Sequence, residues 1–135
     1  NNFSFATPGT TYEVSPDSGI LVQAGNVAGI NIPLIQYFFV VNPMASTKEI
    51  TLKPDMPSAW DYAHLERLLV GNNELSVDFK KSDNKRVYTV ENSQKNWTIN
   101  FRLPEGVNSA MVNGKEANIR SGIISLSGIK NTIEF

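Results

Sequence analysis

The sequence predicts a mainly β fold: an antiparallel β-sandwich preceded by one long α-helix, which Pro33 kinks or breaks. Short runs of alternating apolar and polar residues, separated by turn residues, occupy the chain from residue 49 onward. By contrast, residues 19–41 are apolar almost all round, as in a helix that is buried on most of its faces. Three prolines interrupt residues 40–60, so this stretch marks the seam between a helical piece and an all-β module.

The predicted helix spans about residues 16–40. Ser15 can cap its first free amides, Pro16 suits the first helical position, and Asp17 places negative charge where the helix dipole favours it. The four polar residues Gln23, Asn26, Asn31 and Gln36 argue against a membrane span. A helix this apolar needs packing partners, and the remainder of the chain offers only a sheet.

The strands are predicted from alternation and from the turns that end each run. Residues 49–52 alternate and Pro54 ends them, whereas residues 65–70 are ambiguous between helix and strand. Leu75, Val77 and Phe79 share one face of the next strand. After a turn at residues 82–84, the run at 87–90 completes a hairpin with that strand.

The last third of the chain predicts a meander of short strands. Trp97, Ile99, Phe101 and Leu103 alternate with polar residues, and Asn113-Gly114 is the strongest hairpin signal in the chain. The remaining runs lie at residues 110–112, 116–119, 123–126 and 131–135. Strands of this length at this spacing are typical of a β-sandwich.

Composition excludes several classes of function. A chain of 135 residues with net charge −1 has no basic footprint for nucleic acid, and without cysteine it has neither disulfides nor thiolate metal sites. Its first residues contain no signal peptide, and the start without Met favours an excised fragment or a mature product. We expect no cofactor, no membrane partner and no metal.

The candidates for chemistry are few. His64 is the only histidine, so the further residues that a histidine-based metal site or a serine triad requires are missing. A surface or half-buried histidine near a turn is the better interpretation. Trp60, Tyr62 and Trp97 suggest either a sugar-stacking platform or packing in the core and seam, and packing is favoured.

Glu13 is the remaining candidate, flanked by Tyr12 and Val14 in a loop just before the predicted helix start. Amide dipoles at a helix N-terminus keep a nearby carboxylate ionised, which suits a general base that takes a proton from water. A capping or solvated glutamate explains the same spacing, and spacing alone favours that simpler interpretation.

The order of several motifs resembles the C-terminal end of six-hairpin glycosidases, the (α/α)6-barrel enzymes, and most of all their α-L-rhamnosidase-like group. Tyr12-Glu13 and the SPDSG run precede a last barrel helix with a G-I-x-x-P-like stretch ending in two aromatic residues. A β-module follows that opens with an I-x-P-x-x-P-x-x-W-like element and later carries a V-N-G-K-like hairpin. The matching residues are Gly29, Ile30, Pro33, Phe38 and Phe39, then Leu52, Pro54, Pro57 and Trp60, then Val112 to Lys115.

This resemblance implies roles for individual residues. In such enzymes one carboxylic acid protonates the leaving oxygen and a second carboxylate activates water, with inversion at the sugar carbon. Glu13 matches the place of the general base, with Tyr12 and Trp60 as residues that would contact the sugar. The general acid would lie in upstream barrel helices. Tyr12 stands where some relatives carry Trp beside that glutamate, and Gly25 stands where an aromatic residue is common.

We therefore expect a C-terminal fragment of a bacterial glycoside hydrolase: residues 1–45 as a remnant of the helical barrel and residues 46–135 as a β-sandwich domain. The sandwich would be structural or accessory, inactive alone, and its partner would be the rest of the barrel, which binds the carbohydrate substrate. We also expect a periplasmic or extracellular parent, and a homodimer formed through the exposed helix. The alternative is a non-catalytic carbohydrate-binding or adhesion-type β-sandwich module.

Overall fold

The computed structural model describes residue 32 and residues 34–135 except residue 84. The chain divides into two compact units, residues 1–36 and residues 37–135, and the fold given below is that of the second unit. The predicted site residues Tyr12 and Glu13, and most of the predicted helix, lie outside the described residues.

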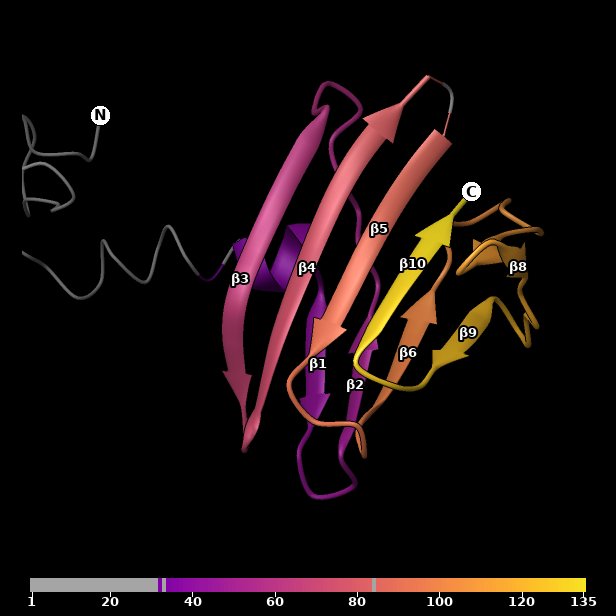
Figure 1. Ribbon diagram of the computed structural model, residues 1–135. Helices are drawn as coiled ribbons and strands as arrows, with labels where there is room; N and C mark the ends of the chain where they lie inside the picture. Colours follow the sequence, from indigo (N-terminus) through magenta and orange to yellow (C-terminus); the bar gives the residue numbers. More distant parts are fainter. Residues whose placement is uncertain (1–31, 33, 84) are drawn as a thin grey trace, which may run out of the picture. The chain divides into compact units, whose positions relative to one another are not determined.

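The second unit is mainly β, as predicted (Figure 1). One short helical turn, η1, precedes the first strand, and Asn113-Gly114 forms the tight turn between β7 and β8 that its sequence predicts. The described elements are η1 (Leu34–Phe38), β1 (Val41–Met44), β2 (Glu49–Leu52), β3 (Tyr62–Val70), β4 (Asn73–Ser82), β5 (Lys85–Asn92), β6 (Thr98–Arg102), β7 (Met111–Val112), β8 (Lys115–Glu116), β9 (Ile123–Leu126) and β10 (Lys130–Glu134).

The strands form two sheets. The smaller sheet has the order β1-β2-β6-β9, and the larger sheet has the order β3-β4-β5-β10-β7-β8. All strand pairs in the larger sheet are antiparallel, whereas β2 and β6 run parallel in the smaller one. The predicted meander after residue 97 is therefore wrong, because β6 and β9 join the smaller sheet while β7, β8 and β10 join the larger one.

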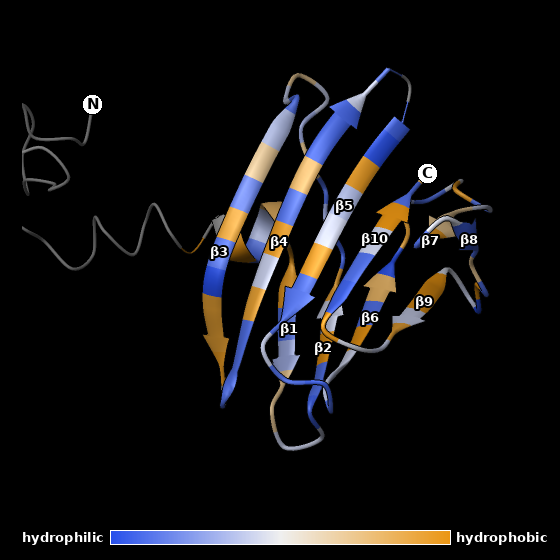
Figure 2. Cartoon of the chain, in the orientation of Figure 1, coloured by the Kyte–Doolittle hydropathy of each residue, from blue (hydrophilic) through white to orange (hydrophobic). Residues whose placement is uncertain are grey.

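The core lies between the two sheets. Along β4 and β6, buried side chains alternate with more accessible ones, which Figure 2 shows as alternating bands of hydropathy. Tyr88 of the larger sheet contacts Phe101 of the smaller sheet, with ring centroids 5.3 Å apart. Trp97, the residue directly before β6, is only 2% exposed, so its predicted packing role is confirmed.

The predicted long helix is not supported by the described residues of its segment. Helical structure there is limited to Ile32 and the five residues of η1. Val40 has a left-handed backbone with φ 45°, and Val41 already begins β1. The carbonyls of Phe38 and Val40 accept hydrogen bonds from the amides of Asp55 (2.8 Å) and Lys53 (3.2 Å), so sheet-side partners replace the next helical turn.

Two further predictions of local structure are resolved by the strand pairing. The ambiguous residues 65–70 belong to β3, and His64 lies within this strand rather than near a turn.

Pro43 lies in β1, where it is opposite Ile50 of β2. A proline is tolerated there because β1 is at the edge of its sheet, with no strand on its other side among the described residues.

Candidate functional site

The aromatic residues suggested for sugar stacking do not form a platform. Trp60 is half-buried and packs on Phe38 of η1, with ring centroids 4.9 Å apart. Trp97 is buried, whereas Tyr62 is 77% exposed, so the expected packing role is wrong for Tyr62 alone. Three rings at such different depths do not offer one flat face to a sugar.

β1 and β3 are edge strands of the two sheets, and they lie on the same side of the sandwich (Figure 1). At one end, the close approach of Gly71, in the β3–β4 turn, to Ala45 and Trp97 joins the two edges: a Cβ on Gly71 would lie 3.5 Å from each of their side chains. At the other end, the Phe38–Trp60 contact joins η1 to the segment that leads into β3. Both edges therefore face the same side of the molecule.

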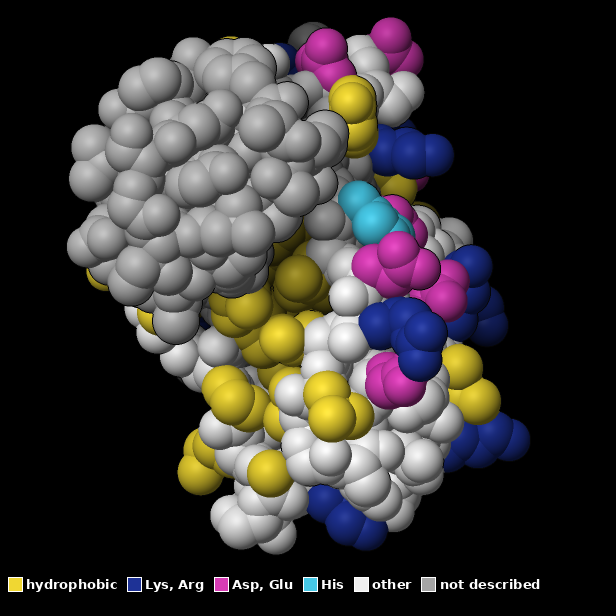
Figure 3. Space-filling view, turned by 90° about the vertical axis from the view of Figure 1, so that its left-hand side faces the viewer, with side chains coloured by type: hydrophobic (Ala, Val, Ile, Leu, Met, Phe, Trp, Pro, Cys, Tyr) yellow, Lys and Arg dark blue, Asp and Glu magenta, His cyan; other side chains and the backbone are white. Residues whose placement is uncertain are grey.

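This side carries large hydrophobic side chains that are exposed to solvent, and we call it the apolar edge. Figure 3 shows hydrophobic side chains gathered on this face beside a band of charged ones. Single exposed apolar residues are ordinary on a protein surface, but several on one side of a molecule suggest a contact surface. Its members are Tyr37 (68% exposed), Met44 (56%), Tyr62 (77%) and Leu69 (68%), of which Tyr62 and Leu69 lie at the two ends of β3, opposite Lys80 and Glu74 of β4.

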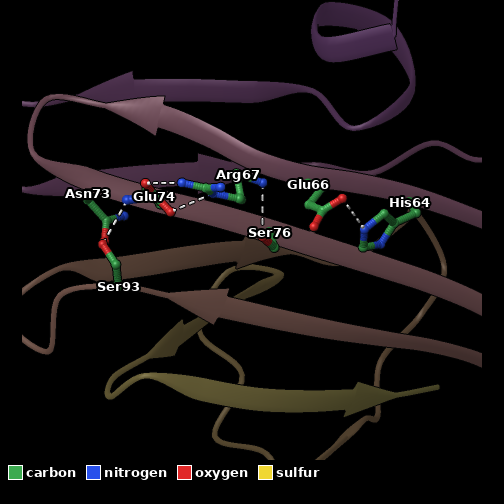
Figure 4. Close-up of polar contacts among 7 residues, drawn as sticks. All are labelled: His64, Glu66, Arg67, Asn73, Glu74, Ser76 and Ser93. Atoms are coloured by element: carbon green, nitrogen blue, oxygen red, sulfur yellow. Dashed lines mark hydrogen bonds and ion pairs between the residues drawn. The ribbon is translucent and has the colours of Figure 1, made fainter.

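A β-bulge in β3 determines which side chains face outward. The register with β4 shifts between Leu65 and Leu68, and Arg67 has a left-handed backbone with φ 53°. The amide of Arg67 donates a hydrogen bond of 3.0 Å to Oγ of Ser76, which satisfies the group that the bulge removes from the ladder (Figure 4). Because of the bulge, Leu69 faces outward while Val70 remains buried.

A row of charged side chains lies on the outer face of β3 and β4. His64 contacts Asp78 through Nδ1, and its Nε2 lies 3.7 Å from a carboxylate oxygen of Glu66. Arg67 holds Glu74 with two hydrogen bonds of 3.0 and 3.1 Å, and this guanidinium lowers the pKa of the Glu74 carboxyl (Figure 4). A general acid needs a raised pKa, so this pair does not provide one. The Arg67–Glu74 ion pair is instead a solvent-exposed contact on the edge strand β3 and its neighbour.

Metal binding finds no support in this row. Within the part of the chain that the structure describes, no group of three or more His, Asp or Glu side chains is placed to hold a metal ion. Nor do the described residues include a helix with the length and apolar character that crossing a membrane requires.

Comparisons with known proteins show which solved structures share this fold. No family model matches the sequence, and no curated protein matches it. Among solved structures, the chain is similar to Streptomyces avermitilis α-L-rhamnosidase complexed with L-rhamnose, with a TM-score of 0.60 and 12% identity over 82% of this chain. It is also similar to α-L-rhamnosidase from Dictyoglumus thermophilum, with a TM-score of 0.60 and 11% identity over 87% of this chain.

At this level of identity the likeness establishes the fold. The match spans only 11% of the first rhamnosidase chain and 15% of the second, so this chain corresponds to a small part of each of those longer chains. A rhamnosidase-like glycoside hydrolase fragment, anticipated from the sequence motifs, is consistent with both matches.

Sequence reasoning did not find the apolar edge. Tyr62 was expected to pack with the other aromatic residues, and Leu69 lies in the run that was ambiguous between helix and strand. No local signal indicates that a bulge turns Leu69 outward. The useful signal was the pair Glu66-Arg67 within an otherwise apolar run, because two consecutive charged residues in a strand are typical of a bulge or an edge.

Proposed function

We propose that this chain is the C-terminal part of a larger glycoside hydrolase, in which the β-sandwich is a non-catalytic unit that packs beside a helical barrel. The observation that carries the proposal is the fold match to two α-L-rhamnosidases over 82–87% of this chain but only 11–15% of theirs. The motif order from Tyr12 to Lys115 supports the same assignment independently of the fold.

The apolar edge is the surface that would contact the barrel. Tyr62 and Leu69 are exposed on the edge strand β3, Met44 on the edge strand β1, and Tyr37 in the helical turn η1 that precedes β1. Exposed apolar side chains at two adjoining sheet edges promote aggregation unless a partner covers them. An apolar helical surface of the same polypeptide is the partner that the proposal requires. A homodimer through the predicted helix remains the alternative use of exposed apolar surface.

Catalysis in the parent would use two carboxylates with inversion. Glu13 would act as the general base that activates water, while an acid from an upstream helix protonates the leaving oxygen. Tyr12 and Trp60 would line the sugar site. The chemistry needs no cofactor. The proposal places the parent outside the cytoplasm, in the periplasm or beyond the cell.

The decisive experiment compares the isolated chain with the longer parent protein on an aryl α-L-rhamnoside. We expect no hydrolysis by the chain alone, because one carboxylate without an acid or an enclosed site cannot stabilise the transition state. In the parent, Glu13→Gln should lower kcat by about 10²–10⁴-fold, the range for general acid–base catalysis. Substantial turnover by the isolated chain, or a parent unaffected by Glu13→Gln, would contradict the corresponding part of the proposal.

A further inference from the structure

The outer face of the smaller sheet contains an open depression of about 480 Å³ that the glycosidase assignment does not use. This volume falls within the ~300–1,000 Å³ typical of small-molecule sites. Its lining comes from three neighbouring strands, β2, β6 and β9, and from the segment that leads into β9. The depression is therefore built on a hydrogen-bonded framework.

Strand register arranges six of the lining residues in two parallel rows. In the first row, Thr51 lies opposite Asn100, and Asn100 lies opposite Ser125. In the second row, Ile123 lies between two arginines, opposite Arg102 on β6 and opposite Arg120 in a tight turn. Residues directly opposite each other project from the same face of a sheet, so all six point into the depression.

The turn at residues 120–123 fixes the position of Arg120. Its amide and carbonyl exchange hydrogen bonds of 3.0 and 2.9 Å with Ile123. Ser121 and Gly122 have φ of 50° and 74°, the left-handed pair of a type I′ turn. The amide of Leu103 donates a hydrogen bond of 2.9 Å to the carbonyl of Gly122, which anchors the turn to β6. Arg102 and Arg120 thus start about two strand spacings apart, roughly 9–10 Å, with Ile123 between them.

The lining is positively charged. It contains two guanidinium groups and no carboxylate, and among the described residues neither arginine takes part in an ion pair. Elsewhere on the described surface, Arg67, Lys85 and Lys130 are each held by a glutamate. The depression therefore presents a local positive potential on a chain whose net charge is −1.

The first row adds neutral hydrogen-bonding groups. Oγ of Ser125 donates a hydrogen bond of 3.0 Å to Oδ1 of Asn100, which leaves the amide nitrogen of Asn100 free to donate to a ligand. The Thr51 hydroxyl and the exposed amide of Asn118 lie in the same lining. Ile123, half-buried between the arginines, offers an apolar patch that suits the C–H face of a sugar ring.

We propose that this depression binds an acidic saccharide, with Arg102 and Arg120 holding the carboxylate of a uronic acid residue. The guanidinium fork matches the two oxygens of a carboxylate, and the amide and hydroxyl groups pair with ring hydroxyls. A small inorganic anion would use the arginines but not the neutral row or Ile123. The inference does not depend on the glycosidase assignment, because it concerns a different face of the sandwich.

The test is calorimetric titration of the 135-residue chain with tri-galacturonate, with maltotriose as the neutral probe and sodium sulfate as the inorganic anion. We expect tri-galacturonate alone to bind measurably in 0.15 M NaCl. Arg102→Gln and Arg120→Gln should each weaken this binding by about tenfold or more, because each removes charge-assisted hydrogen bonds. Asn100→Ala should weaken it by a smaller factor.

Arg67→Gln is the matched control, since it removes the same charge from an exposed arginine of the other sheet and should leave the Kd unchanged. Circular dichroism of each variant confirms folding, which substitution of the exposed Arg102 or Arg120 should not disturb. Absence of tri-galacturonate binding overturns the proposal. Equal binding of sulfate, or equal loss in the Arg67 control, also overturns it, because either result indicates non-specific anion attraction.

Discussion

Nδ2 of Asn73 donates a hydrogen bond of 3.1 Å to Oδ1 of Asn92, and both side chains are buried. Asn73 begins β4 and Asn92 ends β5, so the bond links these two neighbouring strands at one end of the larger sheet. Oδ1 of Asn73 also accepts from the amide of Gln94 at 3.1 Å and from Oγ of Ser93 at 3.4 Å. The side-chain amide of Asn73 thus provides hydrogen-bond partners for residues 92–94, the segment that leads from β5 towards the other sheet.

Asn73→Ala should destabilise the fold substantially. The substitution removes the hydrogen-bond partners of the buried Oδ1 of Asn92 and of the half-buried amide of Gln94. We expect the free energy of unfolding to fall by about 2 kcal/mol, measured by urea denaturation. Asn72→Ala, at the exposed neighbouring position, should change it by less than about 0.5 kcal/mol. Equal losses for the two variants would show that the buried hydrogen bonds of Asn73 do not stabilise the fold.

Tyr88→Phe should alter the alkaline stability profile. Burial raises the pKa of Tyr88 from 10.0 to about 12, while the nearby Arg86 acts in the opposite direction. Below pH 10 the hydroxyl is neutral in both states, so its full contribution is present. As the pH rises from 10 towards 12, the unfolded chain ionises first, and the free energy of unfolding falls by up to about 1.4 kcal/mol per pH unit.

The phenylalanine variant should lose this additional decline, as measured by urea denaturation at several pH values from 8 to 12. At pH 7 its stability should be close to that of the parent chain, because the Tyr88 hydroxyl has no hydrogen-bond partner among the described residues. Tyr62→Phe, at a highly exposed side chain, is the control and should retain the original profile. Identical alkaline slopes for Tyr88→Phe and the original chain would refute the assignment.

Leu69→Glu should reduce self-association without weakening the fold. Leu69 is 68% exposed on the apolar edge, so its replacement removes accessible apolar surface and adds a charge to an edge strand. We expect a lower weight-average mass in sedimentation equilibrium and less binding of an apolar dye. The free energy of unfolding should change by less than about 0.5 kcal/mol. Met111→Glu, at an exposed residue of β7, should leave both measurements unaltered. If both variants behave alike, the edge is not the contact surface.

Gly71→Ala should destabilise the chain through its backbone rather than through crowding. Gly71 has φ +60°, and a Cβ there would meet Ala45 and the Trp97 ring at an ordinary 3.5 Å. We expect a loss of about 1 kcal/mol in the free energy of unfolding, typical of alanine in a left-handed conformation. Gly122→Ala, at φ +74° with nothing within 4 Å, should show a similar loss. A much larger loss at Gly71 would indicate that the β3–β4 turn has no room against Trp97.

Much of the strand content follows from the sequence, because side chains alternate across a strand with a period of two and burial selects apolar residues on one face. Leu75, Val77 and Phe79 are all buried in β4, as their alternation predicts. The Asn113-Gly114 turn also follows from local chemistry, since both residues have left-handed backbones there. The role of Glu13 remains a prediction, because that residue lies outside the described part of the chain.

The sequence by itself determined several strands after residue 49 and the tight Asn113-Gly114 turn, because these depend on neighbours along the chain, whereas it left β3 ambiguous and did not predict β1. Only the tertiary structure decided that β6 joins β2 in parallel, that a bulge turns Leu69 outward, and that Arg102 and Arg120 flank Ile123. The physical reason is that register between strands is set by packing between residues far apart in sequence. The same reason explains the unsupported helix: apolar composition around η1 cannot distinguish helical packing from pairing with the segment after β2.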